Sequence, residues 1–103
     1  MMTSARTAAI RVAGNDDLDA VLHLHTEQGT RPAGPASQQE RQTWLRMLRL
    51  LDLRVYLAVL DGKVVGTATA MEMPNVTYDC APTLFVEAVV VRRLTDAAGL
   101  LLP

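Results

Sequence analysis

The 103-residue chain is long enough for one small domain and too short for two. Half of the residues are apolar, one fifth are charged and the formal net charge is −1, as in ordinary globular proteins. Charges of both signs are interspersed, so we expect no nucleic-acid-binding surface, and no stretch approaches the roughly 20 apolar residues that cross a bilayer. The single cysteine cannot form an internal disulfide and no signal peptide is recognisable, so a cytoplasmic location is expected.

The first part of the chain predicts a strand followed by an amphipathic helix. Apolar side chains alternate with small or charged ones over residues 8–13, which favours a short strand. Residues 17–28 carry apolar side chains at helical spacing, which indicates a helix with one buried face. We expect Asn15 or Asp16 to cap its N-terminus and Gly29 to end it.

A second helix is predicted after the proline-containing segment 30–36, which cannot be regular structure. Ser37 is followed three residues later by Glu40, the spacing of a capping box, so the helix is expected to begin there. Its expected apolar face consists of Trp44, Met47, Leu48 and Leu51, flanked by Leu45 and Leu50.

The remainder of the chain predicts strands. Residues 54–60 and 63–73 are rich in β-branched and apolar residues and are joined by Asp61-Gly62, a strong hairpin signal. Residues 83–91 are nearly all apolar, so we expect a central strand covered on both faces. The order strand, helix, helix, strand, strand, strand predicts an α+β fold with a mostly antiparallel sheet and two helices.

Three stretches in this part of the chain form a recognisable set. They are D-G-K-V-V-G at 61–66, M-P-N at 73–75 and V-E-A-V-V-V at 86–91. In this order and spacing they resemble the GNAT superfamily of N-acetyltransferases, with a resemblance that covers residues 8–91. The resemblance implies transfer of an acetyl group from acetyl-CoA, the co-substrate, to a primary amine of a small molecule or peptide. The sequence leaves the identity of that amine open.

The resemblance also implies which residues would form the site. Main-chain groups of Val89 and Val91, with Val90 between them, would hydrogen-bond the pantetheine arm of the coenzyme. Glu87 stands where many members carry a carboxylate that deprotonates the amine, and burial on an apolar strand would make it a stronger base. Its alternative interpretation is a charge at the sheet edge. The loop 29–37 and the helices beside it would form the amine site.

One departure from the family pattern concerns the phosphate site. After the fourth strand the family places R/Q-x-x-G-x-G/A, a glycine-rich turn that binds the pyrophosphate, and residues 92–99 lack it. With suitable codons, a shifted reading frame after Val91 can encode such a turn, so we hypothesise a frameshift. The expectation is a single incomplete N-acetyltransferase domain over 1–103, truncated after the fourth strand and lacking the usual third helix and later strands, with impaired activity.

Two other functions remain open. The first is a non-catalytic GNAT remnant that acts as an interaction or dimerisation module. It would follow if one sheet face, carrying Val55, Leu57 and Val59 or their alternates, were uncovered, because such a face drives association into a homodimer. The second is an unrelated small α+β binding module. Binding of acetyl-CoA separates the enzyme from both.

Several other residues have simpler interpretations. His23 and His25 lie two apart on one predicted helix and face different ways, so we expect structural histidines and no metal site. Cys80 has no basic neighbour in sequence to activate it, so a catalytic thiol is not expected. Arg92 and Arg93 could attract the coenzyme phosphates, but arginines in such a position are usually solvated.

Overall fold

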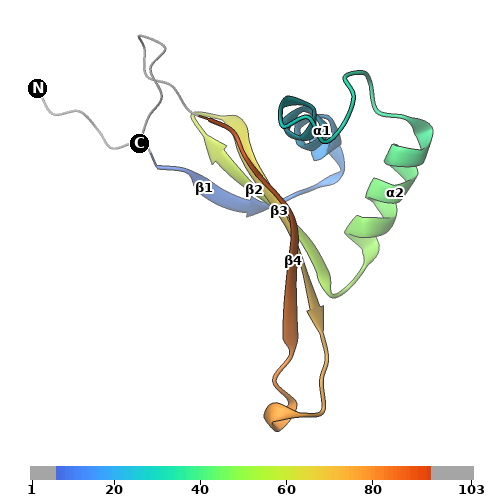
Figure 1. Cartoon of the computed structure of the whole chain (residues 1–103), viewed down its shortest axis with the longest axis vertical. Coiled ribbons are helices and arrows are strands. Elements are labelled where there is room, and N and C mark those ends of the chain that lie inside the picture. Colours follow the sequence, from blue (N-terminus) through green and yellow to red (C-terminus); the bar gives the residue numbers. More distant parts are fainter. Residues whose placement is uncertain (1–6, 94–103) are drawn as a thin grey trace, which may run out of the picture.

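The computed structural model describes residues 7–93, which form a four-stranded antiparallel sheet with two helices on one face (Figure 1). The strands are β1 (Ala9–Val12), β2 (Leu53–Leu60), β3 (Lys63–Met73) and β4 (Thr83–Val91), arranged in that order, and the helices are α1 (Leu18–Glu27) and α2 (Gln38–Arg49). The predicted α+β fold and element order are confirmed. The predictions for residues 94–103, including the frameshift and the missing third helix, lie outside the described residues.

The start of α1 differs from the prediction. A 3₁₀ turn, Asn15–Asp17, precedes the helix, and Asp17 rather than Asn15 or Asp16 occupies the N-cap position. The Asp17 carboxylate accepts a hydrogen bond from the Gly14 N–H (2.7 Å) and pairs with the Arg11 guanidinium (2.8 Å). Hydrogen bonding to Arg11 lowers the pKa of Asp17. The carboxylate therefore joins the turn to β1 and caps no helical N–H, which sequence spacing alone does not reveal.

Helix α2 begins as predicted and ends earlier than its apolar pattern suggested. The Ser37 hydroxyl accepts from the Glu40 N–H (3.0 Å) and the Glu40 carboxylate accepts from the Ser37 N–H (2.9 Å), which confirms the capping box. Trp44 is buried, and its indole N–H donates to the Asn15 carbonyl (3.3 Å). Leu51 lies beyond the last helical residue and is exposed, so its assignment to the apolar face was wrong.

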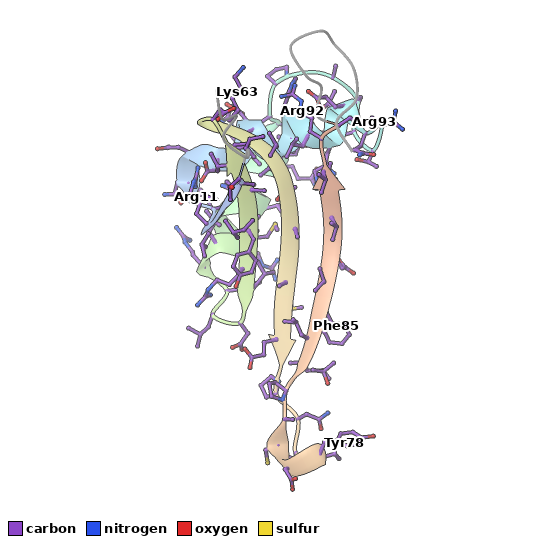
Figure 2. All side chains as sticks on the ribbon, turned by 90° about the vertical axis from the view of Figure 1, so that its left-hand side faces the viewer. Arg11, Lys63, Tyr78, Phe85, Arg92 and Arg93 are labelled. Carbon is purple, nitrogen blue, oxygen red and sulfur yellow. The ribbon has the colours of Figure 1, made fainter. Side chains whose placement is uncertain are left out.

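The hydrophobic core lies between the helices and the central strands. Val55 and Leu57 of β2 are almost completely buried beneath Trp44. The sheet face that carries Val55 and Leu57 is therefore the covered one. The opposite face, which Figure 2 views from the side away from the helices, carries exposed apolar side chains. These are Ile10, Val12, Tyr56, Leu84, Val86, Val89 and Val91.

Strand β4 does not lie where its apolar composition predicted. It is the edge strand of the sheet and pairs only with β3 among residues 7–93. Val90 is its one buried residue, so the prediction of a central strand covered on both faces is wrong for the described structure. A run of apolar residues indicates surface that is suited to burial, but it does not reveal which elements lie beside it.

The turns agree with the sequence. Asp61 and Gly62 both have positive φ (52° and 76°), as a two-residue hairpin requires, which confirms the β2–β3 hairpin. The β3–β4 hairpin extends well away from the helices and has an exposed 3₁₀ turn, Tyr78–Cys80, at its tip (Figures 1 and 2). Neither helix in the described part of the chain is long and apolar enough to traverse a membrane.

Candidate functional site

A β-bulge interrupts the pairing of β3 with β4. Thr67 lies opposite Val90 and Thr69 lies opposite Glu87, so one residue separates the two threonines and two separate their partners. Ala88, within the bulge, has a φ of 52°, a left-handed conformation that is uncommon for a residue other than glycine. Bulges of this kind bend a strand and redirect its side chains.

The bulge decides which side chains of β4 face the helices. Residues two apart on a strand share a face, so Thr67 and Thr69 do, and directly opposed partners share a face as well. Glu87 and Val90 therefore both lie on the helix-covered face, although residues three apart on a regular strand would lie on opposite faces. This brings the predicted carboxylate to the same side as both helices.

The outer edge of β4 carries main-chain polar groups. The Arg92 N–H donates to the Val65 carbonyl (2.7 Å), so Arg92 is turned towards β3. Because main-chain groups alternate in direction along a strand, those of Val91 and Val89 point away from β3. The Val91 carbonyl oxygen lies 3.5 Å from the Gln28 side-chain nitrogen, a long hydrogen bond. An extended ligand with amide groups can therefore pair with this edge.

The structure places Glu87 at the surface. Its side chain is exposed, so the burial that was expected to strengthen it as a base is absent in the described residues and that expectation was wrong. Glu87 borders a cavity of about 260 Å³ together with Leu53, Thr69, Met71 and Phe85.

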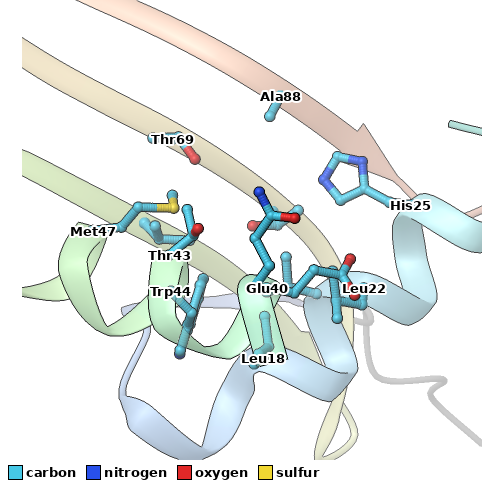
Figure 3. A pocket seen from close by; sticks show the side chains of 13 residues that line it. Leu18, Leu22, His25, Glu40, Thr43, Trp44, Met47, Thr69 and Ala88 are labelled. Atoms are coloured by element: carbon cyan, nitrogen blue, oxygen red, sulfur yellow. The ribbon is translucent and has the colours of Figure 1, made fainter. Parts of the chain in front are cut away.

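A larger cavity, of about 370 Å³, lies between α1, α2 and the sheet (Figure 3). Its apolar walls include Leu18, Leu22, Trp44 and Met47, and its polar lining includes His25, Gln39, Thr43, Thr67 and Thr69. Ala88 also lines it, so the bulge of β4 forms part of its wall. The hydroxyl oxygen of Thr67 is buried and has no hydrogen-bond partner among the described residues. The cavity thus combines an apolar body with a few polar groups, as small-molecule sites do.

The end of α1 fixes a histidine in the wall of this cavity. Gly29 has a φ of 80°, and its N–H donates to the Thr26 carbonyl (3.1 Å) while the Thr30 N–H donates to the His25 carbonyl (3.0 Å). These two bonds define a Schellman motif, which confirms Gly29 as the helix stop. They also bring the Thr30 hydroxyl to 3.0 Å from Nδ1 of His25.

Both histidines are expected from the sequence to be structural, but their surroundings in the structure differ. His23 pairs with Glu27 of the same helix (2.8 Å) and is exposed, whereas His25 points into the cavity (Figure 3). The signal that could have identified His25 is its position four residues before a C-terminal Gly29-Thr30 pair. Residues 7–93 contain no group of three or more His, Cys, Asp or Glu side chains that could hold a metal ion.

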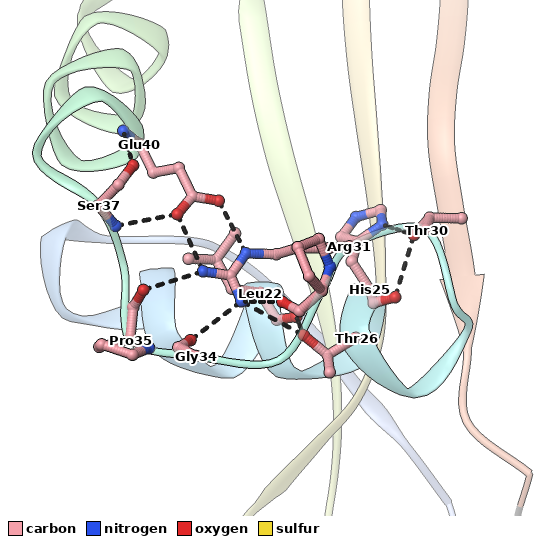
Figure 4. A network of polar contacts seen from close by, with 10 residues as sticks. Leu22, His25, Thr26, Thr30, Arg31, Gly34, Pro35, Ser37 and Glu40 are labelled. Atoms are coloured by element: carbon pink, nitrogen blue, oxygen red, sulfur yellow. Dashed lines mark hydrogen bonds and ion pairs between the residues drawn. The ribbon is translucent and has the colours of Figure 1, made fainter.

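Hydrogen bonds from one arginine stabilise the loop 29–37 beside the cavity (Figure 4). The Arg31 guanidinium donates to both Glu40 carboxylate oxygens (2.7 and 2.9 Å) and to the carbonyls of Pro32, Gly34 and Pro35 (3.0–3.1 Å). The hydrogen bonds from Arg31, and then those from Ser37, lower the pKa of Glu40 to about 2. The charge of Glu40 is therefore engaged within the wall.

The Arg31–Glu40 pair predicts a pH dependence of stability. The pKa of Glu40 is about 2 in the folded chain against a reference value of 4.5, so its stabilisation is fully present above pH 4.5 and is lost as the pH falls towards 2. Urea unfolding at a series of pH values should show wild type losing stability relative to Glu40→Gln over this range. Glu72→Gln, at an exposed carboxylate of β3, serves as the control and should follow wild type. Parallel curves for wild type and Glu40→Gln would contradict the prediction.

The arginines after β4 differ in their surroundings. The Arg92 guanidinium donates to both carboxylate oxygens of Glu27 (3.1 and 2.6 Å), which ties the end of β4 to α1. Arg93 borders a cavity of about 320 Å³ with Leu24, Gln28, Glu27, Val90 and Arg92. The charge of Arg92 is thus already paired.

Known proteins resemble this chain in fold. No family model matches the sequence, and no curated protein matches it. Several solved structures match the fold. One is a protein of Agrobacterium tumefaciens str. C58 that its name assigns provisionally as an acetyltransferase, with 31% identity and a TM-score of 0.73 over 82% of this chain. A Trypanosoma brucei acetyltransferase matches at 26% identity and a TM-score of 0.63 over 82% of this chain.

A third match is an aminoglycoside N-acetyltransferase in complex with CoA, at 20% identity and a TM-score of 0.65 over 89% of this chain. The chain spans 58% of the Agrobacterium protein and 60% of each of the other two. The chain has the fold of the GNAT acetyltransferase superfamily, so the resemblance predicted from the sequence is confirmed.

Proposed function

We propose that this chain takes part in transferring an acetyl group from acetyl-CoA to a primary amine. The observation that carries the proposal is the bulge at Ala88, which lies between the outer edge of β4 and the cavity beneath the helices. A thioester held along the edge and an amine held in the cavity would meet there. Two of the structural neighbours named above are called acetyltransferases, and one of these was solved with CoA, which supports the use of an acyl-CoA donor.

The residues of β4 suit the pantetheine arm. Its two amides can pair with outward main-chain groups of Val89 and Val91, while the buried side chain of Val90 anchors the strand between them. Glu87 follows on the helix-covered face and is proposed to accept a proton from the amine nitrogen during the reaction. The amine itself, on a small molecule or a peptide, would enter between the helices and the loop 29–37.

The phosphates of the coenzyme are expected to contribute little to its binding. The sequence of residues 92–99 lacks the family's glycine-rich motif, and Arg92 is paired with Glu27. S-acetylpantetheine, which lacks the nucleotide, should therefore bind with an affinity similar to that of acetyl-CoA in calorimetric titrations and support similar transfer rates. Tight, micromolar binding of acetyl-CoA alone would contradict this expectation. If neither thioester acetylates any amine in a broad panel, the proposed function itself is wrong.

A second candidate, a non-catalytic module that pairs with another copy of this chain, is supported by a different observation. The sheet face opposite the helices carries exposed apolar side chains on β1, β2 and β4, including Ile10, Leu84 and Val86. Apolar patches of this kind favour association. Sedimentation equilibrium should then show a homodimer that Val86→Lys dissociates, whereas a monomer at all concentrations would exclude this candidate.

A further inference from the structure

The cavity between α1, α2 and the sheet contains a histidine whose role can be inferred from its contacts. This inference rests on the proposed acetyl transfer and adds a residue and an acceptor class to it. We propose that His25 is a catalytic base that takes a proton from the acceptor, and that the acceptor is a monoamine with an apolar body. Four observations support this: the hydrogen bonds of His25, the direction of its ring, the unpaired Thr67 hydroxyl and the charges around the cavity.

The hydrogen bonds at the end of α1 favour one tautomer of His25. The Thr30 hydroxyl has a single hydrogen, which it donates to the His25 main-chain carbonyl (3.1 Å). With that hydrogen on the carbonyl, the Thr30 oxygen is available to accept from an Nδ1–H of the His25 ring, 3.0 Å away, and this is the tautomer that we assign. In a neutral imidazole with Nδ1 protonated, Nε2 carries the lone pair. Nε2 is thus left as a proton acceptor, and no group among the described residues hydrogen-bonds to it.

The ring is directed at the place where the amine is needed. His25 projects from the last turn of α1 into the cavity, on the side where Ala88 of the β4 bulge forms the wall (Figure 3). The buried, unpartnered hydroxyl of Thr67 lines the same cavity. Because buried polar atoms are normally hydrogen-bonded, this hydroxyl is available to pair with a polar group of a bound ligand.

The charges around the cavity define the class of acceptor. In the described part of the chain, His25 and Glu40 are the titratable groups that line it. Glu40 is engaged by Arg31 and Ser37, and Glu87 of β4 borders the smaller neighbouring cavity. The lining therefore offers no unengaged carboxylate for a second ammonium and no cation for a phosphate. Its apolar walls suit an alkyl or aryl body.

The proposed proton transfers balance. An ammonium ion gives one proton to Nε2 of His25, which later releases it to solvent. The neutral nitrogen then bonds to the thioester carbonyl carbon, and the carbon–sulfur bond breaks as the amide forms. The second proton leaves the nitrogen through Glu87 and ends on the sulfur of the departing thiol. Two proton acceptors thus serve two successive losses from one nitrogen.

Replacement of His25 tests the proposal with 2-phenylethylamine as the acceptor probe and S-acetylpantetheine as the donor. His25→Gln should lower kcat about 10²–10⁴-fold, the usual contribution of a general base. His23→Gln, on the exposed side of α1, should behave as wild type. Wild type should also prefer 2-phenylethylamine to the diamine putrescine.

The outcomes separate this inference from the proposed function. If wild type transfers acetyl groups and His25→Gln does so equally fast, His25 is no base although the function stands. If wild type transfers nothing, the proposed function fails and imidazole nitrogen NMR decides the inference. An Nδ1–H tautomer whose Nε2 signal shifts on adding 2-phenylethylamine would support it, and an Nε2–H tautomer or an unchanged signal would overturn it.

Discussion

Glu87→Gln is expected to lower the rate of acetyl transfer about 10²–10⁴-fold, because glutamine keeps the shape of the side chain and cannot accept a proton. The loss should appear in kcat, while the KM for the thioester should change little, since the proposed donor contacts involve main-chain groups of Val89 and Val91. Steady-state kinetics with S-acetylpantetheine and 2-phenylethylamine would measure both quantities.

The control for this variant is Glu72→Gln, which removes an exposed carboxylate from β3 and should leave kcat unchanged. Because Glu87 is exposed, its replacement should alter the free energy of unfolding by no more than about 0.5 kcal/mol, so a folding defect would not explain a slow variant. A wild-type rate in Glu87→Gln would support the alternative interpretation, in which this residue is only a charge on the sheet.

Leu57→Ala is expected to lower the free energy of unfolding by about 2–5 kcal/mol, the range for truncating a large side chain in a packed core. Leu57 is completely buried, with 0% of its surface exposed, and it lies under both helices in the cluster that includes Trp44 and Val55. A loss of this size is a large fraction of the stability of a small domain. Urea unfolding followed by Trp44 fluorescence would measure it.

The same substitution at Leu51 provides a matched control. Leu51 follows α2 and is 83% exposed, so Leu51→Ala should change the free energy of unfolding by less than about 0.5 kcal/mol. Equal losses at the two positions would show that the sheet face carrying Leu57 is not the core. The comparison also tests the assignment of the covered face, which the sequence left open between Leu57 and its alternates.

Features whose causes lie within a few residues could be predicted from the amino-acid sequence. Ser37 and Glu40 satisfy each other's backbone N–H groups, Gly29 adopts a positive φ that ends a helix, and Asp61-Gly62 fits a two-residue hairpin. Each depends on local hydrogen bonds or local backbone freedom, so spacing and residue type suffice to predict it. The order of elements followed from these local signals, and the resemblance to the GNAT fold followed from three stretches of sequence at 61–66, 73–75 and 86–91.

Features that depend on neighbours distant in sequence could be seen only in the folded chain. The Asp17 carboxylate pairs with Arg11 instead of capping the helix. Strand β4 lies at the edge of the sheet, and the Glu87 side chain is exposed. The bulge at Ala88 depends on the register between two strands, and the position of His25 in the cavity wall depends on how α1 packs on the sheet. The length of an apolar run indicates how much surface can be buried, but which side chains lie at the site depends on the elements that pack against it.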